Sequence, residues 1–189
     1  IKIADRKVEN VFLNGSTSDY VKTTNFDFDL GRFYSEVESN GSRNVAVLGS
    51  EISTKLFPRG DALDKTIKIG PVNFKVVGVL TEQGSTLLGA FNPDNQVFVP
   101  IGTIFKNFTS RHFGTVTINV RAASPEMLED TKAEAEGVMR KIRGLAHSEP
   151  NDFTINQQEG LTDFLDSITI VIKIAGLFIT GLSLFVGAI

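Results

Sequence analysis

The stretch that comes closest to a catalytic motif is Arg59–Thr66, which ends in a Lys-Thr pair like that of a phosphate-binding loop. Such a loop needs glycines so that its backbone amides can wrap around phosphates, but Arg59 and Asp64 stand at the glycine positions. The motif also needs a helix after Lys65-Thr66, whereas a strand is expected there. We therefore predict that this stretch does not bind a nucleotide.

Asp27 and Asp29 are the nearest approach to a carboxylate pair for acid–base catalysis. Alternate positions of a strand share one face, and a solvated strand edge is the favoured interpretation of this pair. Gly49-Ser50 and Gly84-Ser85 lack the G-x-S-x-G spacing of a nucleophile elbow and are interpreted as a helix cap and a loop. No catalytic residue is predicted.

The composition removes further classes of site. The chain has no cysteine, which excludes a disulfide framework, a zinc knuckle and a thiol nucleophile. Its two histidines, His112 and His147, leave little material for a histidine-based metal site or general base. The net charge of the 189 residues is −3, and no basic cluster occurs along the sequence, so a nucleic-acid groove is not expected. We predict no cofactor, no metal and no nucleic-acid partner.

The last 22 residues, Ile168–Ile189, carry a single charge, Lys173. A helix of this length is about 33 Å long at 1.5 Å per residue, enough to cross the hydrocarbon layer of a bilayer. A buried core helix is the alternative, but core helices seldom run this far without a polar face. We predict a membrane span in contact with lipid. Because the chain starts at Ile1 without a methionine and stops inside the apolar run, we expect a fragment of a longer protein.

The residues before the span indicate its orientation. No Lys or Arg lies between Arg143 and Lys173, and cytoplasmic flanks tend to carry such residues. Residues 1–167 are therefore predicted to be extracytoplasmic. Lys173 is expected to extend its ammonium group to the interface, an intramembrane ion site being the alternative. The acidic residues of this flank are Glu149, Asp152, Glu159, Asp163 and Asp166.

Two helical faces are predicted near and inside the span. Spacings of 4, 3 and 4 place four small residues on one face, where they let a second helix approach closely in lipid. They are Gly176, Thr180, Ser183 and Gly187. Upstream, an apolar stripe with the i, i+3, i+4, i+7 spacing predicts a stalk helix that continues into the span. It consists of Leu161, Phe164, Leu165 and Ile168.

The rest of the chain alternates strand and helix patterns. A hairpin is predicted over residues 1–13, strands over Val45–Leu48, 66–69, 72–80 and 96–99, and a helix over Glu51–Phe57. Ser124-Pro125-Glu126 predicts a helix start and Gly144 its end. With strands over 115–121 and 153–156, this helix would form a right-handed crossover between parallel strands. The fold class is α+β with two lobes.

The order of these features resembles the periplasmic core domain of MacB/FtsX-type ABC transporter permeases. The resemblance covers nearly the whole chain, with one departure at Asp64, where the family usually has glycine. The matching stretches are residues 31–33, Val45-Ala46-Val47-Leu48-Gly49, 55–57, 61–67, Phe74-Lys75-Val76-Val77-Gly78-Val79-Leu80, Val97-Phe98-Val99-Pro100 and 184–189.

The resemblance implies a split α/β lobe similar to the porter domains of efflux pumps, with a β-rich lobe inserted in it. The chain then divides into residues 1–42 (an incomplete first part of the porter-like lobe), 43–108 (the inserted lobe), 109–160 (the second part, with the strand–helix–strand unit) and 161–189 (stalk and transmembrane helix). It further implies a homodimeric permease in the bacterial inner membrane, a separate or fused cytoplasmic ABC ATPase, and a periplasmic adaptor or outer-membrane partner.

Two functions from different classes follow. The first is a noncatalytic domain that couples cytoplasmic ATP hydrolysis to export or to mechanical work across the membrane. The alternative is a membrane-anchored ligand-binding or sensor module without transport. Three further hydrophobic segments after Ile189 would favour the permease, and a cytoplasmic signalling domain would favour the sensor.

The predicted orientation is testable in intact cells. A cysteine that replaces Asp152 is expected to react with a membrane-impermeant thiol reagent, because this side of the span is predicted to face away from the cytoplasm. Labelling is measured against a cysteine placed beyond Ile189, which should be protected. The reverse pattern would overturn the orientation.

Overall fold

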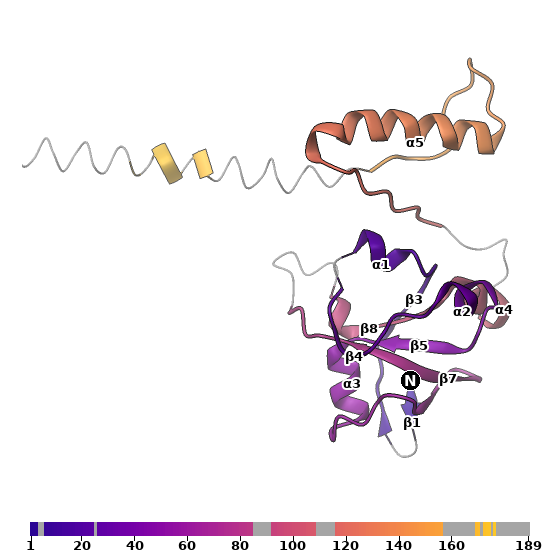
Figure 1. Cartoon of the computed structure of the whole chain (residues 1–189), viewed down its shortest axis with the longest axis vertical. Helices are drawn as coiled ribbons and strands as arrows, with labels where there is room; N and C mark the ends of the chain where they lie inside the picture. The colour runs from indigo at the N-terminus through magenta and orange to yellow at the C-terminus, as the bar shows by residue number, and fades with distance from the viewer. Residues whose placement is uncertain are drawn as a thin grey trace, which may run out of the picture. The chain divides into compact units, whose positions relative to one another are not determined.

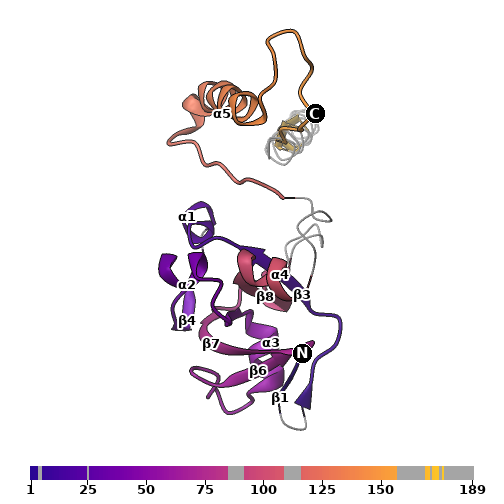
Figure 2. The ribbon, with the colours of Figure 1, turned by 90° about the vertical axis from the view of Figure 1, so that its right-hand side faces the viewer.

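The computed structural model describes residues 1–3, 6–24, 26–84, 92–108, 116–156, 169–170, 172–174 and 176. The chain divides into two compact units, Ile1–Arg121 and Ala122–Ile189, which are drawn in Figures 1 and 2.

The first unit is built on one mixed sheet. Its described strands follow the order β2-β1-β6-β7-β5-β8-β3, and β4 pairs with β7 outside this path. The β3–β8 and β5–β7 pairs are parallel, and the other pairs are antiparallel. The strands are β1 (Lys2–Ile3), β2 (Arg6–Lys7), β3 (Phe12–Ser16), β4 (Phe28–Gly31), β5 (Val45–Leu48), β6 (Thr66–Ile69), β7 (Val72–Leu80) and β8 (Gln96–Pro100).

Short helices connect these strands. Each ends within two turns, and α3 stops immediately before Phe57-Pro58, as predicted from the proline. The helices of this unit are α1 (Tyr20–Thr23), α2 (Glu36–Asn40), α3 (Ser50–Leu56), the 3₁₀ turn η1 (Pro93–Asn95) and α4 (Ile101–Asn107).

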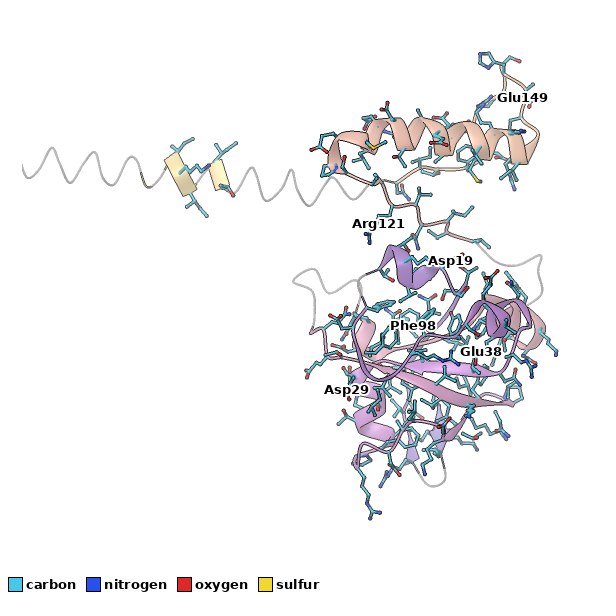
Figure 3. The ribbon with its side chains drawn as sticks, viewed as in Figure 1. Asp19, Asp29, Glu38, Phe98, Arg121 and Glu149 are labelled. Atoms are coloured by element: carbon cyan, nitrogen blue, oxygen red, sulfur yellow. The ribbon has the colours of Figure 1, made fainter. Side chains whose placement is uncertain are left out.

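The core lies on both faces of β5 and β8. Ala46 and Leu48 of β5 belong to one apolar cluster with Ile52 and Leu56 of α3, while the alternate residue Val47 packs on the other face against an aromatic cluster. Phe98 of β8, labelled in Figure 3, is fully buried in that second cluster. Burial on both faces explains why Val45–Leu48 and Val97–Pro100 are continuous apolar runs.

The aromatic cluster is held by one buried phenol. Tyr34 is 2% exposed, and its Oη interacts with Ser16 Oγ and lies 3.1 Å from the carbonyl oxygens of Ser16 and Val99. Burial raises the pKa of the Tyr34 phenol well above its usual range. The phenol therefore stays neutral and ties β3 to β8.

In β6 one face of the sheet is wet, as predicted from the alternation. Ile67 and Ile69 are buried, whereas Thr66 and Lys68 are exposed. The sequence also predicted the ends of β6 and β7 correctly. The backbone of β7 also lies close to Arg32, because a Cβ on Gly78 would clash with the carbonyl oxygen of Arg32.

The predicted hairpin over residues 1–13 is only partly present. Lys2–Ile3 and Arg6–Lys7 pair in antiparallel register, but the run after Val8 does not continue the second strand. Phe12–Ser16 instead pairs in parallel with Gln96–Pro100 at the far edge of the sheet. Local alternation could not reveal this partner, because it lies more than eighty residues away in sequence.

The second unit contains η2 (Pro125–Met127) and α5 (Leu128–Arg143), as predicted from Ser124-Pro125-Glu126. The helix ends at Gly144, which has the left-handed φ of 71° expected of a glycine C-cap. The segment that follows α5 is held to the helix by polar contacts. Arg143 of the helix forms an ion pair with Asp152 of this segment, and the Arg143 guanidinium lowers the pKa of Asp152.

The strands predicted on either side of α5 are wrong for the described residues. Neither 116–121 nor 153–156 forms a strand, and the alternating side chains Val116, Ile118 and Val120 are 56%, 64% and 59% exposed. A strand exists only where its backbone groups find a partner strand, and the described residues provide none for these segments. The right-handed crossover is therefore absent here.

The sheet includes strands from two of the four parts into which the sequence was divided. Strands from residues 1–42 and from residues 43–108 hydrogen-bond within one sheet. The assignment of these parts to a porter-like lobe and an inserted lobe stays a prediction.

A polar network fixes the start of α2. Arg32 donates to both carboxylate oxygens of Glu38, at 2.7 and 3.1 Å, and the backbone amide of Ser35 donates to Glu38 Oε2 at 2.7 Å. Ser35 Oγ accepts in turn from the Glu38 amide, which completes a capping box. Chiefly through the Arg32 hydrogen bonds, the network lowers the pKa of Glu38 to about 2.

This lowered pKa predicts an acid-labile contribution to stability. Because the folded pKa lies below the ordinary value of 4.5, the contribution is complete above about pH 5 and is lost as the pH falls towards 2. Glu38→Gln is expected to lower the free energy of unfolding at pH 7 by about 1 kcal/mol, since Arg32 is largely exposed. It should also flatten the acid limb in urea titrations. Glu36→Gln, in the same first turn, is the control, and an identical acid limb in both variants would contradict the prediction.

Candidate functional site

The stretch that resembles a phosphate loop is a turn leading into a strand. Thr66 begins β6 rather than a helix, and the Lys65 ammonium lies 3.8 Å from the Asp61 carboxylate. Asp64 has the left-handed φ of 62°, a conformation that glycine adopts without strain. Its carboxylate pairs with Lys75 at 2.7 Å. The departure from the family pattern at Asp64 is thus accommodated in the backbone, and nothing in this turn is arranged to wrap a phosphate.

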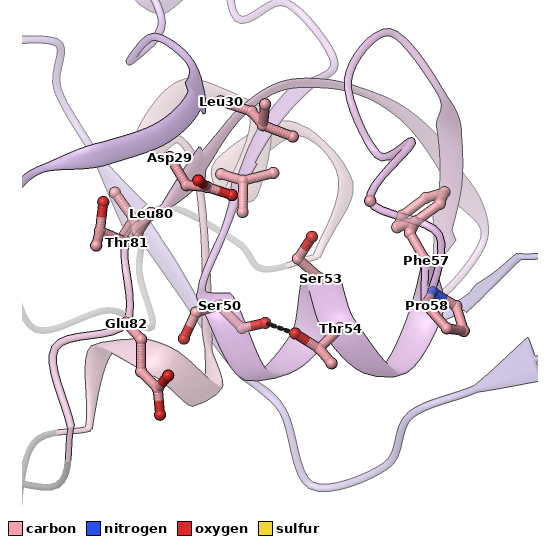
Figure 4. A pocket seen from close by; sticks show the side chains of 12 residues that line it. Asp29, Leu30, Ser50, Ser53, Thr54, Phe57, Pro58, Leu80, Thr81 and Glu82 are labelled. Carbon is pink, nitrogen blue, oxygen red and sulfur yellow. Dashed lines mark hydrogen bonds between the residues drawn. The ribbon is translucent and has the colours of Figure 1, made fainter.

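A cavity of about 410 Å³ lies between α3, β4 and the end of β7, shown in Figure 4. Its apolar wall includes Leu30 and Phe57, and its polar groups include the carboxylates of Asp29 and Glu82. Ser53 is 8% exposed and is directed into this space. The remaining lining residues are Ser50, Thr54, Pro58, Gly60, Val79, Leu80 and Thr81.

The cavity lacks the partners that would make a serine reactive. A nucleophilic hydroxyl needs an adjacent base such as an imidazole or an amine, and neither occurs among the described residues that line the space. The Thr54 hydroxyl is engaged by the Ser50 carbonyl at 2.9 Å. Asp27 and Asp29 are both exposed, which agrees with their interpretation as a solvated strand edge.

One buried carboxylate, Asp94, is 6% exposed and was not predicted from the sequence. Its oxygens accept from the backbone amides of Gln83 at 3.1 Å and Gly84 at 2.9 Å, and its own amide donates to Asn92 Oδ1 at 2.9 Å. Asp94 therefore joins the chain after β7 to the chain before β8. An Asn-Pro-Asp run is a recognisable turn signal, but its partners cannot be read from it.

Most residues of the two predicted helical faces lie outside the described part of the chain. This applies to the whole stalk face, Leu161, Phe164, Leu165 and Ile168, and to Thr180, Ser183 and Gly187 of the packing face. Gly176 is described and is helical. Within the described residues, no helix has the length and apolar character needed to span a bilayer, and both faces stay predictions.

The apolar side chains of α5 are incompletely covered. Val138 is 50% exposed and Ile142 is 71% exposed, and no residue of the helix is buried. An amphipathic helix of this kind normally hides its apolar stripe against a neighbour. Among the described residues of the second unit, no element provides such a neighbour.

Residues 2–138 match the family model of the MacB-like periplasmic core domain. The chain belongs to this family. The resemblance found in the sequence is thereby confirmed, and the matched region is a periplasmic core domain rather than the ATP-binding part of such a protein.

The relatives that this chain matches are larger proteins. The macrolide export ATP-binding/permease protein MacB of Bdellovibrio bacteriovorus is 30% identical over 163 residues, which cover 85% of this chain and 24% of that protein. The protein of the same description from Shigella dysenteriae is 26% identical and is matched over 93% of this chain and 26% of its own length. The chain thus spans about a quarter of these relatives.

Two solved structures share the fold of this chain. The periplasmic region of MacB from Actinobacillus actinomycetemcomitans superposes with a TM-score of 0.60 at 18% identity, covering 82% of this chain and 64% of that one. The extracellular domain of the ABC-type transporter YknZ from Gram-positive bacteria gives 0.58 at 20% identity, with 78% and 72% covered. The mixed α/β architecture of this chain is therefore similar to that of these two solved domains.

The geometry of the 59–66 turn predicts that the chain does not bind ATP. Calorimetric titration of the purified chain with Mg-ATP is expected to give no saturable heat, because Lys65 faces Asp61 and Thr66 begins a strand instead of the helix that a phosphate loop needs. Lys65→Ala is the test variant and Lys55→Ala the matched control. Saturable binding that is lost only in Lys65→Ala would contradict the prediction.

Proposed function

We propose that this chain is the noncatalytic extracytoplasmic domain of an ABC transporter permease and that it couples cytoplasmic ATP hydrolysis to export or to mechanical work across the membrane. The observation that carries the proposal is the family match over residues 2–138, together with relatives described as export ATP-binding/permease proteins. In this proposal residues 1–167 lie outside the cytoplasm and residues 168–189 anchor the chain in the inner membrane.

The site geometry supports a role without chemistry. No imidazole or amine occurs among the described residues that line the cavity beside α3, and no cluster of metal-ligating side chains occurs in the described part of the chain. Such a domain acts by changing which surfaces it presents. The partners in this proposal are membrane lipid, a cytoplasmic ABC ATPase, a second copy of the protein, and an adaptor or outer-membrane protein.

The half-exposed face of α5 fits this proposal. Val138 and Ile142 need a cover that the described second unit does not supply, and a further segment of the same longer protein would complete such a lobe. An anchored sensor module is the alternative. A role in transport and a role in sensing differ in what happens when the proposed stalk is immobilised.

The stalk is immobilised by a disulfide between two copies of the full-length protein. A cysteine replaces Ser167, and oxidation is expected to link adjacent stalks, since a disulfide requires Cα atoms within about 7 Å. Transport should then fall sharply and return on reduction, while ATP hydrolysis persists at least in part. Transport is measured as efflux of the exported compound from vesicles.

Lys106→Cys, an exposed position on α4, is the control for cysteine introduction and oxidation. Undiminished transport in a fully crosslinked Ser167→Cys dimer would show that stalk separation is not required, and the coupling role would fail. Absence of any crosslink along the stalk would contradict the homodimer instead.

A further inference from the structure

Three lysines from three strands stand in one row across the wet face of the sheet. Lys2 of β1 is the direct register partner of Lys7 of β2 and of Lys68 of β6, and Lys68 is in turn opposite Asn73 of β7. Direct partners lie on the same face of a sheet. We call Lys7, Lys2 and Lys68 the lysine row.

The row is exposed and only partly neutralised. All three side chains are exposed, and Lys7 forms an ion pair with Glu9. Within the part of the chain that the structure describes, Lys2 and Lys68 form no ion pair. Among the described residues the row thus presents two ammonium groups outside any ion pair, although the whole chain has a net charge of −3.

Such a row destabilises the free protein. Like charges directly opposite each other in a sheet are unfavourable, and neighbouring strands are only about 4.8 Å apart, within the screening length at physiological salt. Protection of a sheet edge is one ordinary reason for lysine on a strand. That reason applies to Lys7 on β2 at the end of the described sheet, but not to Lys2 and Lys68, whose strands are paired on both sides.

The residues around the lysine row indicate which kind of partner could neutralise it, a lipid bilayer or a polar macromolecule. The same face carries Thr66 opposite Lys75, which are polar and exposed. A membrane-binding surface combines basic residues with apolar groups that insert into the lipid. The large exposed hydrophobic side chains of the described residues do not come from β1, β2, β6 or β7. The face is therefore suited to a polar macromolecular surface rather than to a bilayer.

We propose that the lysine row is a docking surface for an acidic segment of a partner protein. Carboxylates on alternate residues of an extended segment lie about 7 Å apart, and the flexible lysine side chains can reach them across the row. Neutral hydrogen-bonding groups beside the row, on Thr66 and Asn73, match a peptide backbone. The surface requires only the folded first unit and is independent of the coupling role of the stalk.

The test uses the full-length protein in phosphatidylcholine nanodiscs and a capped, fluorescent oligoglutamate peptide of about ten residues. The peptide is expected to bind with an affinity that falls as salt rises. Lys2→Gln/Lys68→Gln should weaken binding roughly tenfold, whereas Lys106→Gln/Lys141→Gln, which removes two exposed lysines elsewhere, should not. Lys2→Arg/Lys68→Arg should retain binding, because the charge is kept.

A stability measurement separates docking from a structural role. If the row is retained for a partner, Lys2→Gln/Lys68→Gln should raise the thermal midpoint of the unbound protein by about one to three degrees, because repulsion is relieved. A lowered midpoint would assign the lysines to the fold and overturn the proposal. It would equally fail if the peptide did not bind, if both glutamine pairs weakened binding alike, or if only phosphatidylglycerol vesicles captured the protein in flotation.

Discussion

The constraint on which the first unit depends is that β5 and β8 bury both of their faces. A strand with two apolar faces must be covered by two separate layers, and the unit provides α3 on one side and an aromatic cluster on the other. The aromatic side chains come from α1, from β4 and the segments around it, and from β8 itself. These elements are positioned so that they cover the second face of β5 and β8. Inside this apolar layer a buried polar atom needs a hydrogen-bond partner, and the Tyr34 hydroxyl finds one in the carbonyl oxygen of Val99.

Where no apolar layer covers the second face of the sheet, that face is charged and exposed. Beyond β7 the second layer ends, and the exposed positions of β6 and β1 carry Lys68 and Lys2 instead of apolar residues. The same sheet thus combines β5 and β8, which are covered on both faces, with β6 and β1, which are covered on one face. The doubly covered strands stabilise the fold, and the exposed face of β6 and β1 is open to a partner.

The sequence was sufficient wherever the signal is local. Strand ends in β6 and β7, the stop of α3 before Pro58 and the glycine cap of α5 were predicted from a few neighbouring residues each. It was insufficient wherever the partner is distant. The parallel pairing of β3 with β8, the buried contacts of Asp94 and the alignment of Lys2 with Lys68 depend on register between segments far apart in the chain. The predicted strands over 115–121 and 153–156 failed for a related reason, because alternation indicates a face but does not provide a partner strand.

The parallel pair formed by β3 and β8 has a consequence for how the chain acquires its structure. Phe12 is aligned with Gln96 and Ser16 with Pro100, so β3 has no ladder until almost the whole first unit has been made. Contacts between such distant residues form slowly, because loop closure costs entropy before any pairing compensates it. In a chain that emerges on the far side of a membrane from its amino terminus, residues 12–16 must wait in an unpaired state while the next eighty residues emerge. Among the described strands β3 pairs only with β8, so its edge stays unprotected until β8 has emerged, and during this period the unit is vulnerable to misassembly and proteolysis.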